Sequence, residues 1–321
     1  KNKKKSKLLI CKSQKIVDFT NITNYLSKND VLVFNDTKVL PSIIVGKFKD
    51  KQVKVTLLEE INNFIWHAFI KSSIKIKIGD KILFKDYVWC EVIEKKMTIA
   101  KVKFNLKNKK VRIFLDKYGD LPLPPYTKNI SNRYLDEKYY QTVFAKKKGA
   151  VACPTAGLHF NKEIIKELKK KKIMLINITL HVGMGTFLPL KSRNIKENIL
   201  HKEKGIISKS SANLINKSIK EGKKIVAVGT TVMRLLESCY AKYGKIQYFN
   251  EETDIFIYPG FKFNVIDKLL TNFHLPQSSL LLLVSAFGGI NKIKNNYNFA
   301  MEKRLNFFSF GDAMLINKYE I

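Results

Sequence analysis

The chain has 321 residues, of which 45% are hydrophobic and 11% aromatic, so it can fold around one large or two ordinary cores and is not disordered throughout. Its 59 basic residues exceed its 27 acidic residues by 32, and because only five of them are arginine, 54 are lysine. This charge would suit a polyanionic partner such as nucleic acid, but a lysine-rich soluble surface explains it equally well.

No apolar run approaches the roughly 20 residues that span a bilayer, and the apolar run at Leu8–Ile10 is too short for a secretory signal. The chain does not begin with methionine, so we expect its amino end to be trimmed. The four cysteines (Cys11, Cys90, Cys153 and Cys239) are far apart and form no C-x-x-C pair. We therefore expect reduced thiols, a cytoplasmic protein and no bound metal. We also expect a monomer without membrane association.

A continuous apolar stretch at 30–34 predicts a strand that is buried on both faces and ends at the polar turn 35–37. Residues 52–57, 74–78 and 81–84 are strand-like, and Gly79-Asp80 suggests a hairpin between the last two. This part indicates a small antiparallel β domain, either a barrel or a sandwich. The proline-rich segment 121–126 then predicts a stiff connector.

Helices and strands alternate after this connector. Helices are expected after the N-cap Asn161, over 210–220 before Gly222, and over 232–239. Strands are expected over 173–180, 225–228, 255–258 and the apolar run 280–287. The alternation predicts an α/β fold with a largely parallel sheet. The pattern alone leaves open whether the β domain leads or interrupts the α/β domain. We predict an insertion, with a discontinuous α/β catalytic domain at 1–45 and 120–321 and a small antiparallel β-barrel-like domain at 46–119.

Polar turns that carry glycine, threonine or histidine occupy the predicted ends of these strands, where α/β proteins bind their ligands. Each turn alone has an ordinary structural explanation: the Gly-x-Gly at 183–185 lacks a third glycine, and Thr230 and Thr231 can simply cap a helix. A single histidine is also more often structural than catalytic. Histidines in three such turns (His159, His181 and His274) nevertheless suggest proton transfer or ligand binding.

Seven segments taken together resemble one family, the S-adenosylmethionine:tRNA ribosyltransferase-isomerases, or QueA family, of queuosine biosynthesis. The segments are FNDTKVLP (34–41), PTAGLHF (154–160), TLHVGMGTF (179–187), VGTT (228–231) with Arg234 and Glu237, TDIFIYPG (253–260), TNFHLP (271–276) and FFSFGDAMLI (307–316). They occur in order along most of the chain, whereas the β segment matches only loosely.

The resemblance implies an enzyme that moves and isomerises the ribosyl unit of S-adenosylmethionine onto 7-aminomethyl-7-deazaguanine at the wobble position of a tRNA. The product would be epoxyqueuosine-tRNA, with adenine and methionine released. S-adenosylmethionine is then a co-substrate, and no recycled cofactor or metal is implied. Such chemistry needs a base near the sulfonium carbon, assistance to adenine departure, and fixed polar groups for both substrates.

We hypothesise that His159 and His181 exchange protons and that Arg234 holds a carboxylate or a tRNA phosphate. An ion pair between Arg234 and Glu237 is the structural alternative. The expected substrate-binding residues are Asn35, Asp36, Thr37, Thr155, Gly183, Gly185, Thr186, Thr230, Thr231, Glu237, Asp254, Asn272, His274 and Asp312. Lysines of the β domain (Lys75, Lys77 and Lys81) could contact the tRNA backbone or simply form a solvated face.

Two other functions are compatible with the same sequence. A non-catalytic basic RNA-binding protein would explain the charge but not the histidine-bearing turns, and an inactive paralogue would keep the fold without turnover. The chain also departs from the family pattern. It has Lys3, Lys4 and Lys7 where the family usually places two arginines and an aspartate, and Val232 and Cys153 replace smaller family residues.

Overall fold

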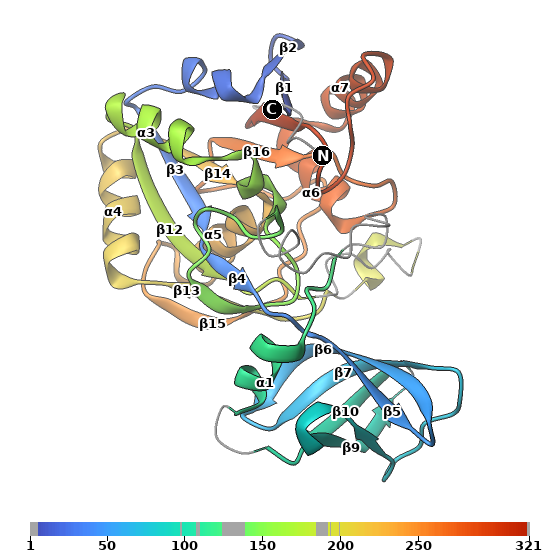
Figure 1. Ribbon diagram of the computed structural model, residues 1–321. Coiled ribbons are helices and arrows are strands. Elements are labelled where there is room, and N and C mark those ends of the chain that lie inside the picture. Colours follow the sequence, from blue (N-terminus) through green and yellow to red (C-terminus); the bar gives the residue numbers. More distant parts are fainter. Residues whose placement is uncertain are drawn as a thin grey trace. The chain divides into compact units, whose positions relative to one another are not determined.

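The computed structural model describes residues 6–96, 98–106, 110–123, 139–183, 192, 194–198 and 200–319 (Figure 1). Its contacts divide the chain into two units, each formed by separate stretches of sequence. The first unit comprises 1–38, 141–147 and 153–321, and the second comprises 39–140 and 148–152. The domain limits predicted from the sequence stay a prediction.

A nine-stranded mixed sheet is the centre of the first unit, with the order β15-β13-β12-β3-β14-β16-β17-β1-β2. Neighbouring strands β12, β3, β14 and β16 are parallel, β1 is parallel to β17, and the remaining pairs are antiparallel. The strands are β1 (Lys7–Ile10), β2 (Lys15–Asp18), β3 (Asp30–Asn35), β12 (Met174–Leu180), β13 (Glu203–Ile207), β14 (Lys224–Val228), β15 (Phe249–Thr253), β16 (Lys268–Asn272) and β17 (Ala313–Asn317).

The parallel strands carry apolar side chains on both faces because each face of the sheet is covered. In β3, Val31 and Val33 belong to one core cluster, while Leu32 and Phe34 belong to another. The α-helices of this unit are α3 (Lys162–Lys170), α4 (Lys209–Lys220), α5 (Thr230–Tyr243), α6 (Ser279–Gly288) and α7 (Ile290–Glu302), and the short 3-10 helices are η1 (Phe19–Asn24), η3 (Thr155–His159) and η5 (Ile195–Glu197). The predicted doubly buried strand at 30–34 is thereby confirmed.

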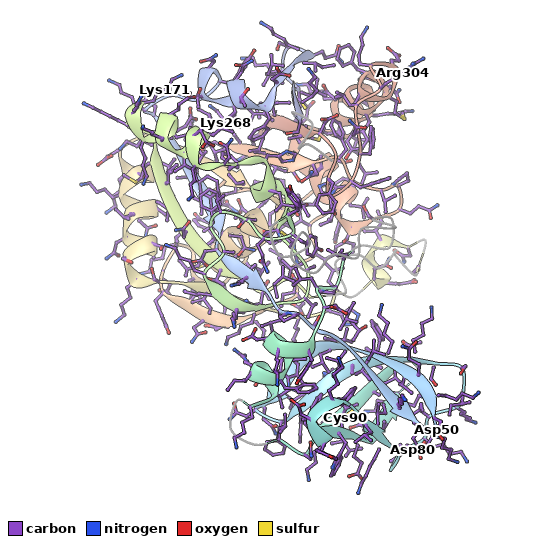
Figure 2. All side chains as sticks on the ribbon, viewed as in Figure 1. Asp50, Asp80, Cys90, Lys171, Lys268 and Arg304 are labelled. Carbon is purple, nitrogen blue, oxygen red and sulfur yellow. The ribbon has the colours of Figure 1, made fainter. Side chains whose placement is uncertain are left out.

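The second unit contains a closed six-stranded antiparallel barrel with the order β10-β7-β6-β5-β8-β9. Its strands are β5 (Ile43–Phe48), β6 (Lys51–Asn62), β7 (Ile65–Ser72), β8 (Lys81–Leu83), β9 (Trp89–Lys96) and β10 (Ile99–Phe104), accompanied by η2 (Lys85–Tyr87) and α1 (Lys110–Tyr118). Val53, Val55 and Leu57 alternate into the barrel core, where the Cys90 thiol also lies (Figure 2). Strands β4 (Thr37–Val39) and β11 (Lys147–Ala150) form a separate two-stranded sheet.

Most of the predicted elements are present. The α/β class and the barrel-like β domain are confirmed, as are the strands at 52–57, 81–84, 173–180 and 225–228 and the three predicted helices, whose ends move by a few residues. The Asn161 side chain caps α3 by accepting a hydrogen bond from the Ile164 amide. Gly222 follows α4 with a φ of +69°, the left-handed conformation that ends helices. All four cysteines are free thiols, and burial raises the pKa of Cys90 to about 12.

Three predicted strands are wrong. Residues 74–78 lead into a turn, in which the Lys77 amide donates a hydrogen bond to the Asp80 carboxylate (2.7 Å). Gly79 adopts a φ of +89° in this turn, a conformation that favours glycine. Residues 255–258 also lie outside the strands, since β15 ends at Thr253. A period of two or a short apolar run therefore does not by itself make a strand, because strand formation also requires a neighbouring strand to pair with.

The apolar run 280–287 belongs to helix α6. Its buried positions (279, 283, 284, 287 and 288) recur with the spacing of a helix face, and the Ser278 side chain caps the helix by accepting from the Leu281 amide. The run was predicted as a strand because its one polar residue, Ser285, is not enough to reveal a period. Within the described residues, no helix has the length and apolar character needed to cross a bilayer.

Candidate active site

Asn35, the last residue of β3, joins three elements at the carboxyl end of the sheet. Its amide nitrogen donates to the Leu180 carbonyl (2.9 Å) and to the Thr231 hydroxyl (3.3 Å), and its oxygen accepts from the amides of Leu180 and Thr37 (both 3.1 Å). The side chain is 4% exposed. Asn35 therefore holds together the ends of β3 and β12 and the start of α5, where several of the predicted site residues lie.

Asp36 and Thr37 continue the chain from this junction and contact the end of β12. The Thr179 hydroxyl donates to the Asp36 carboxylate (2.6 Å), and the Thr37 hydroxyl lies 2.8 Å from Nδ1 of His181. The backbone of His181 is fixed as well, because its amide donates to the Lys204 carbonyl (2.9 Å). When Nδ1 of His181 donates to Thr37, Nε2 carries the lone pair that a general base requires.

A second polar cluster joins β16 to η3 through the Asn272 side chain. Asn272 accepts from the Thr155 hydroxyl (3.2 Å) and donates to the Phe308 carbonyl (3.1 Å), which sets the orientation of its amide. The amide nitrogen therefore donates to Nε2 of His159 (3.1 Å). In the neutral ring the proton then sits on Nδ1, which faces the Ser6 hydroxyl at 3.0 Å.

The His159 ring is held from its face as well as from its edges. It stacks on Phe19 with a centroid separation of 4.8 Å. Backbone next to each of the two polar clusters lies at the start of α5. There Gly229 donates to the carbonyl of Leu270 in β16 (2.8 Å), and a Cβ on Gly229 would lie 3.5 Å from Ala156 of η3. The φ of +95° at Gly229 favours glycine at this turn.

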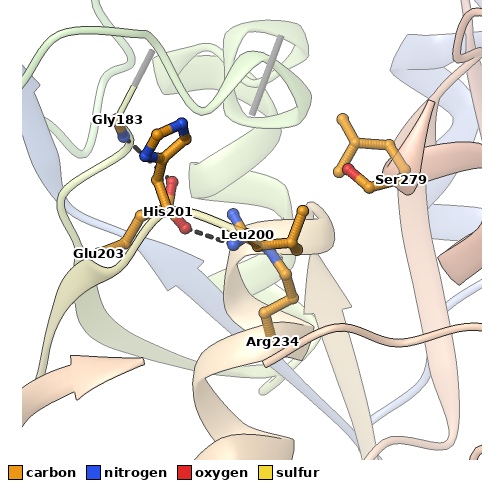
Figure 3. A pocket seen from close by; sticks show the side chains of 7 residues that line it. Gly183, Leu200, His201, Glu203, Arg234 and Ser279 are labelled. Carbon is orange, nitrogen blue, oxygen red and sulfur yellow. Dashed lines mark hydrogen bonds and ion pairs between the residues drawn. The ribbon is translucent and has the colours of Figure 1, made fainter. Parts of the chain in front are cut away.

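Arg234 lies one helical turn into α5 and forms a buried ion pair with Glu203 of β13 (Figure 3). Arg234 and Glu203 are each 4% exposed, and the second Glu203 oxygen accepts from the Gly183 amide (3.0 Å). Both residues line a pocket whose other walls are Gly183, Leu200, His201, Ser279 and Leu280. The alternative pairing of Arg234 with Glu237 is therefore wrong, because Glu203 takes that position.

Glu237 instead holds the loop that leads to β16. Its carboxylate accepts hydrogen bonds from the backbone amides of Asn264 (3.0 Å), Val265 (3.0 Å) and Ile266 (3.1 Å). Burial raises the pKa of Glu237, and these three donors offset part of that rise. Both carboxylate oxygens of Glu237 therefore accept hydrogen bonds from the backbone. This arrangement is typical of a residue that stabilises the fold.

The other predicted residues are distributed around these clusters. Thr230 and Thr231 lie at the start of α5 and are each 6% exposed. The Asp312 carboxylate accepts from the amides of Lys7 (2.7 Å) and Asn306 (2.6 Å), which ties β1 to the turn before β17. Asp254 is exposed after β15. Gly185 and Thr186 lie outside the described residues.

His274 follows β16 and is partly buried. Its Nε2 lies 3.0 Å from the Thr271 hydroxyl, and its backbone amide donates to the Tyr297 hydroxyl (2.9 Å). Burial lowers the pKa of His274 to about 4, so the ring is neutral at pH 7. His274 can therefore donate or accept a hydrogen bond near neutral pH but does not carry a charge there.

Sequence reasoning missed Glu203, Ser279 and the pocket that they share with Arg234. An acidic residue between Lys202 and Lys204 was the only signal of Glu203, and it does not indicate burial. Among the residues that the structure describes, no three histidine, cysteine, aspartate or glutamate side chains come together as a metal site. The arrangement thus offers two histidines in fixed orientations, one buried arginine and a helix start at the carboxyl edge of the sheet.

Comparison with known proteins identifies relatives along the whole chain. A family model described as "Queuosine biosynthesis protein" matches residues 1–316. The chain is 46% identical over 301 residues to the S-adenosylmethionine:tRNA ribosyltransferase-isomerase of Sulfurihydrogenibium sp. (strain YO3AOP1), a match that covers 93% of this chain and 87% of the relative. The enzyme of the same name from Rickettsia bellii (strain RML369-C) is 42% identical, with 97% and 92% covered.

A solved structure supports the same relationship. The crystal structure of S-adenosylmethionine tRNA ribosyltransferase from Thermotoga maritima is similar to this chain with a TM-score of 0.53 and 30% identity. The similarity covers 98% of this chain and 94% of the Thermotoga chain. Sequence and fold therefore point to the same set of relatives.

Replacement of Asn35 by aspartate tests the junction of the strands. Asn35→Asp keeps the side-chain shape but places a carboxylate oxygen against the Leu180 carbonyl, which loses its donor. We expect the free energy of unfolding to fall by about 2–4 kcal/mol at pH 7. The loss should shrink at low pH, where a protonated carboxyl can donate to Leu180. Urea unfolding at both pH values measures this, and equal losses in Asn35→Asp and in the exposed control Asn29→Asp would contradict it.

The low pKa of His274 predicts a pH-dependent stability. An unfolded histidine titrates near 6.5 and the folded ring near 4, so the unfolded chain binds more protons between these values. His274 should therefore lower the free energy of unfolding by up to about 3 kcal/mol as the pH falls from 6.5 to 4. Below pH 4 its contribution should not change further. In urea unfolding from pH 7 to pH 4.5, His274→Gln should lose less stability than the wild type. Equal losses of stability in His274→Gln and in the wild type over this pH range would contradict the expectation.

Proposed function

The chain belongs to the queuosine biosynthesis protein family and is a transferase-isomerase, and on this premise we propose that it transfers and isomerises the ribosyl unit of S-adenosylmethionine onto 7-aminomethyl-7-deazaguanine at the wobble position of a tRNA. The products are epoxyqueuosine-tRNA, adenine, methionine and a proton. S-adenosylmethionine is consumed as a ribosyl donor, without a recycled cofactor or metal. We place this activity in the cytoplasm and in a monomer.

The observation that supports this reaction best is the pair of histidine clusters at one edge of the sheet. His181 is oriented by Thr37, and His159 is oriented by Asn272 and Thr155. A ribosyl transfer with rearrangement needs proton movement at more than one atom, and two oriented imidazoles near the start of α5 can supply it. The role of each residue in this reaction is part of the proposal.

We assign the proton abstraction beside the sulfonium to His181. Its Nδ1 is next to the Thr37 hydroxyl, and in the tautomer that donates Nδ1–H to this hydroxyl the basic lone pair is on Nε2. Both nitrogens of His159 face fixed partners, Asn272 at Nε2 and Ser6 at Nδ1, and the ring stacks on Phe19. His159 is therefore better suited to hold the Asn272 cluster in place, or to donate a hydrogen bond to the departing adenine, than to act as the base.

The tRNA partner is supported by the charge of +32 and by the names of the relatives. Electrostatic attraction to phosphates would strengthen binding at low salt. Lys75, Lys77 and Lys81 are exposed on the barrel unit and are proposed contacts of the tRNA backbone. Lys81 also lies 4.6 Å from the centroid of the Trp89 ring, so its ammonium is partly engaged within the chain.

Adenine release tests the proposed function directly. The protein is incubated with S-adenosylmethionine and either tRNA bearing 7-aminomethyl-7-deazaguanine or the same tRNA with an unmodified guanine, and free adenine is measured by chromatography. We expect adenine only with the modified tRNA, together with a mass gain on that tRNA. Methylated tRNA with adenosylhomocysteine would contradict the reaction. Bound tRNA without adenine release would instead favour an inactive paralogue or an RNA-binding protein.

In the same assay, His181→Ala should lower kcat by roughly 10²–10⁴-fold, because the general base is lost. Thr37→Val keeps the shape of Thr37 but removes the hydroxyl beside Nδ1, so we expect a smaller loss and a shifted pH profile. His67→Ala, on the barrel surface, serves as the control at saturating tRNA. A His181→Ala variant with near-normal kcat and an unchanged melting temperature would show that His181 is not the base.

A further inference from the structure

One edge of the buried Arg234 guanidinium forms no hydrogen bond with the described residues. Its Nη1 pairs with Glu203, but Nε and Nη2 are buried without a hydrogen-bond partner among the described residues. The side chain is only 4% exposed, so bulk water does not compensate these two donors. A buried donor of a charged group is costly to leave unsatisfied. The arrangement is therefore explained best by a ligand that accepts from this edge.

The two unpartnered donors favour a carboxylate. Nε and Nη2 project from the same side of the planar guanidinium, and parallel hydrogen bonds from that side match the two oxygens of one carboxylate. A hydroxyl or a ring nitrogen would satisfy only one of the two donors. The adjacent Glu203 carboxylate already contributes one negative charge, which disfavours a doubly charged phosphate at the same guanidinium.

Apolar side chains and one hydroxyl line the pocket in front of Arg234. Leu200 and Leu280 provide apolar walls, and the buried Ser279 lies at the first turn of α6. Figure 3 shows the guanidinium of Arg234 between Glu203 on one side and Ser279 on the other. Glu203 is itself anchored by the Gly183 amide (3.0 Å), so the guanidinium is held in a constant orientation.

We propose that this pocket binds the amino-acid end of the ribosyl donor, with the donor's α-carboxylate on the Nε and Nη2 edge of Arg234. This inference rests on the proposed function, because it takes S-adenosylmethionine as the donor. Leu200 and Leu280 would then contact the methylene groups between the sulfonium and the α-carbon. The pocket would select donors that retain the carboxylate over nucleosides that lack it.

A matched pair of ligands tests this assignment without turnover. S-adenosylhomocysteine carries the carboxylate, and its decarboxylated counterpart, S-adenosyl-3-thiopropylamine, does not. In calorimetric titrations the wild type should bind S-adenosylhomocysteine roughly tenfold to hundredfold more tightly, as a bidentate charged pair predicts. Arg234→Lys keeps a positive charge for Glu203 but loses the planar edge, so the preference should fall below about threefold while the decarboxylated ligand binds as before.

A second pair of variants keeps Arg234 and so avoids disturbing its ion pair. Leu280→Glu places a carboxylate at the pocket wall, where it can occupy the free edge and abolish the preference for the ligand carboxylate. Leu280→Gln has the same size without the charge and should keep the preference. The melting temperature of Arg234→Lys shows whether that variant folds. If it does not, the two Leu280 variants alone test whether the ligand carboxylate binds Arg234.

The possible outcomes separate the two proposals. A wild type that binds both ligands equally, or an Arg234→Lys or Leu280→Glu variant that keeps the full preference, would overturn the assignment of the carboxylate and leave S-adenosylmethionine as the donor. A wild type that binds neither of the ligands nor S-adenosylmethionine itself would overturn the donor and the assignment together. Loss of the preference in Leu280→Glu with its retention in Leu280→Gln would support the assignment.

Discussion

The hydrogen bonds of the Asn35 amide determine how the site is assembled. One buried side chain satisfies both backbone groups of Leu180, the amide of Thr37 and the hydroxyl of Thr231. These partners come from the neighbouring strand β12, from the first residue of β4 and from the first turn of α5. An apolar residue at position 35 would leave several of these groups unsatisfied in a dry environment. The positions of Thr37, His181 and α5 thus follow from the donors and acceptors of one amide.

A second constraint comes from burying charge beside this junction. Arg234 is placed by α5 and Glu203 by the antiparallel edge strand β13, so their ion pair links elements that are far apart in the chain. Glu203 satisfies one end of the guanidinium and leaves the other end facing the pocket. A fully satisfied arginine would only stabilise the fold, whereas this partly satisfied one retains donors for a ligand. In the proposed site, stability and ligand recognition therefore depend on the same pair of charges.

Sequence patterns predicted those elements whose signals are local. The apolar run of β3, the Asn161 cap of α3 and the glycine after α4 each depend on a few neighbouring residues, and each is present. The run 280–287 was wrongly predicted as a strand, because a mostly apolar run fits a buried strand as well as a buried helix. Only the packing of Leu283 and Phe287 in the core distinguishes the two structures. His159, from one of the histidine-bearing turns, and Asp312 were both predicted to act on the substrates, and in the structure both form hydrogen bonds within the chain.

The sequence by itself determined the α/β class with a β-barrel-like domain, the family, and the turns that carry its polar residues, because these are properties of residue order and local propensity. It could not determine which polar groups meet. An ion pair of Arg234 with Glu237, one helical turn away, was the structural alternative, but Arg234 pairs with Glu203, which is 31 positions distant in the chain. Only the tertiary structure decides such pairings, because the register of neighbouring strands brings distant side chains into contact and burial then requires each charge to find a partner.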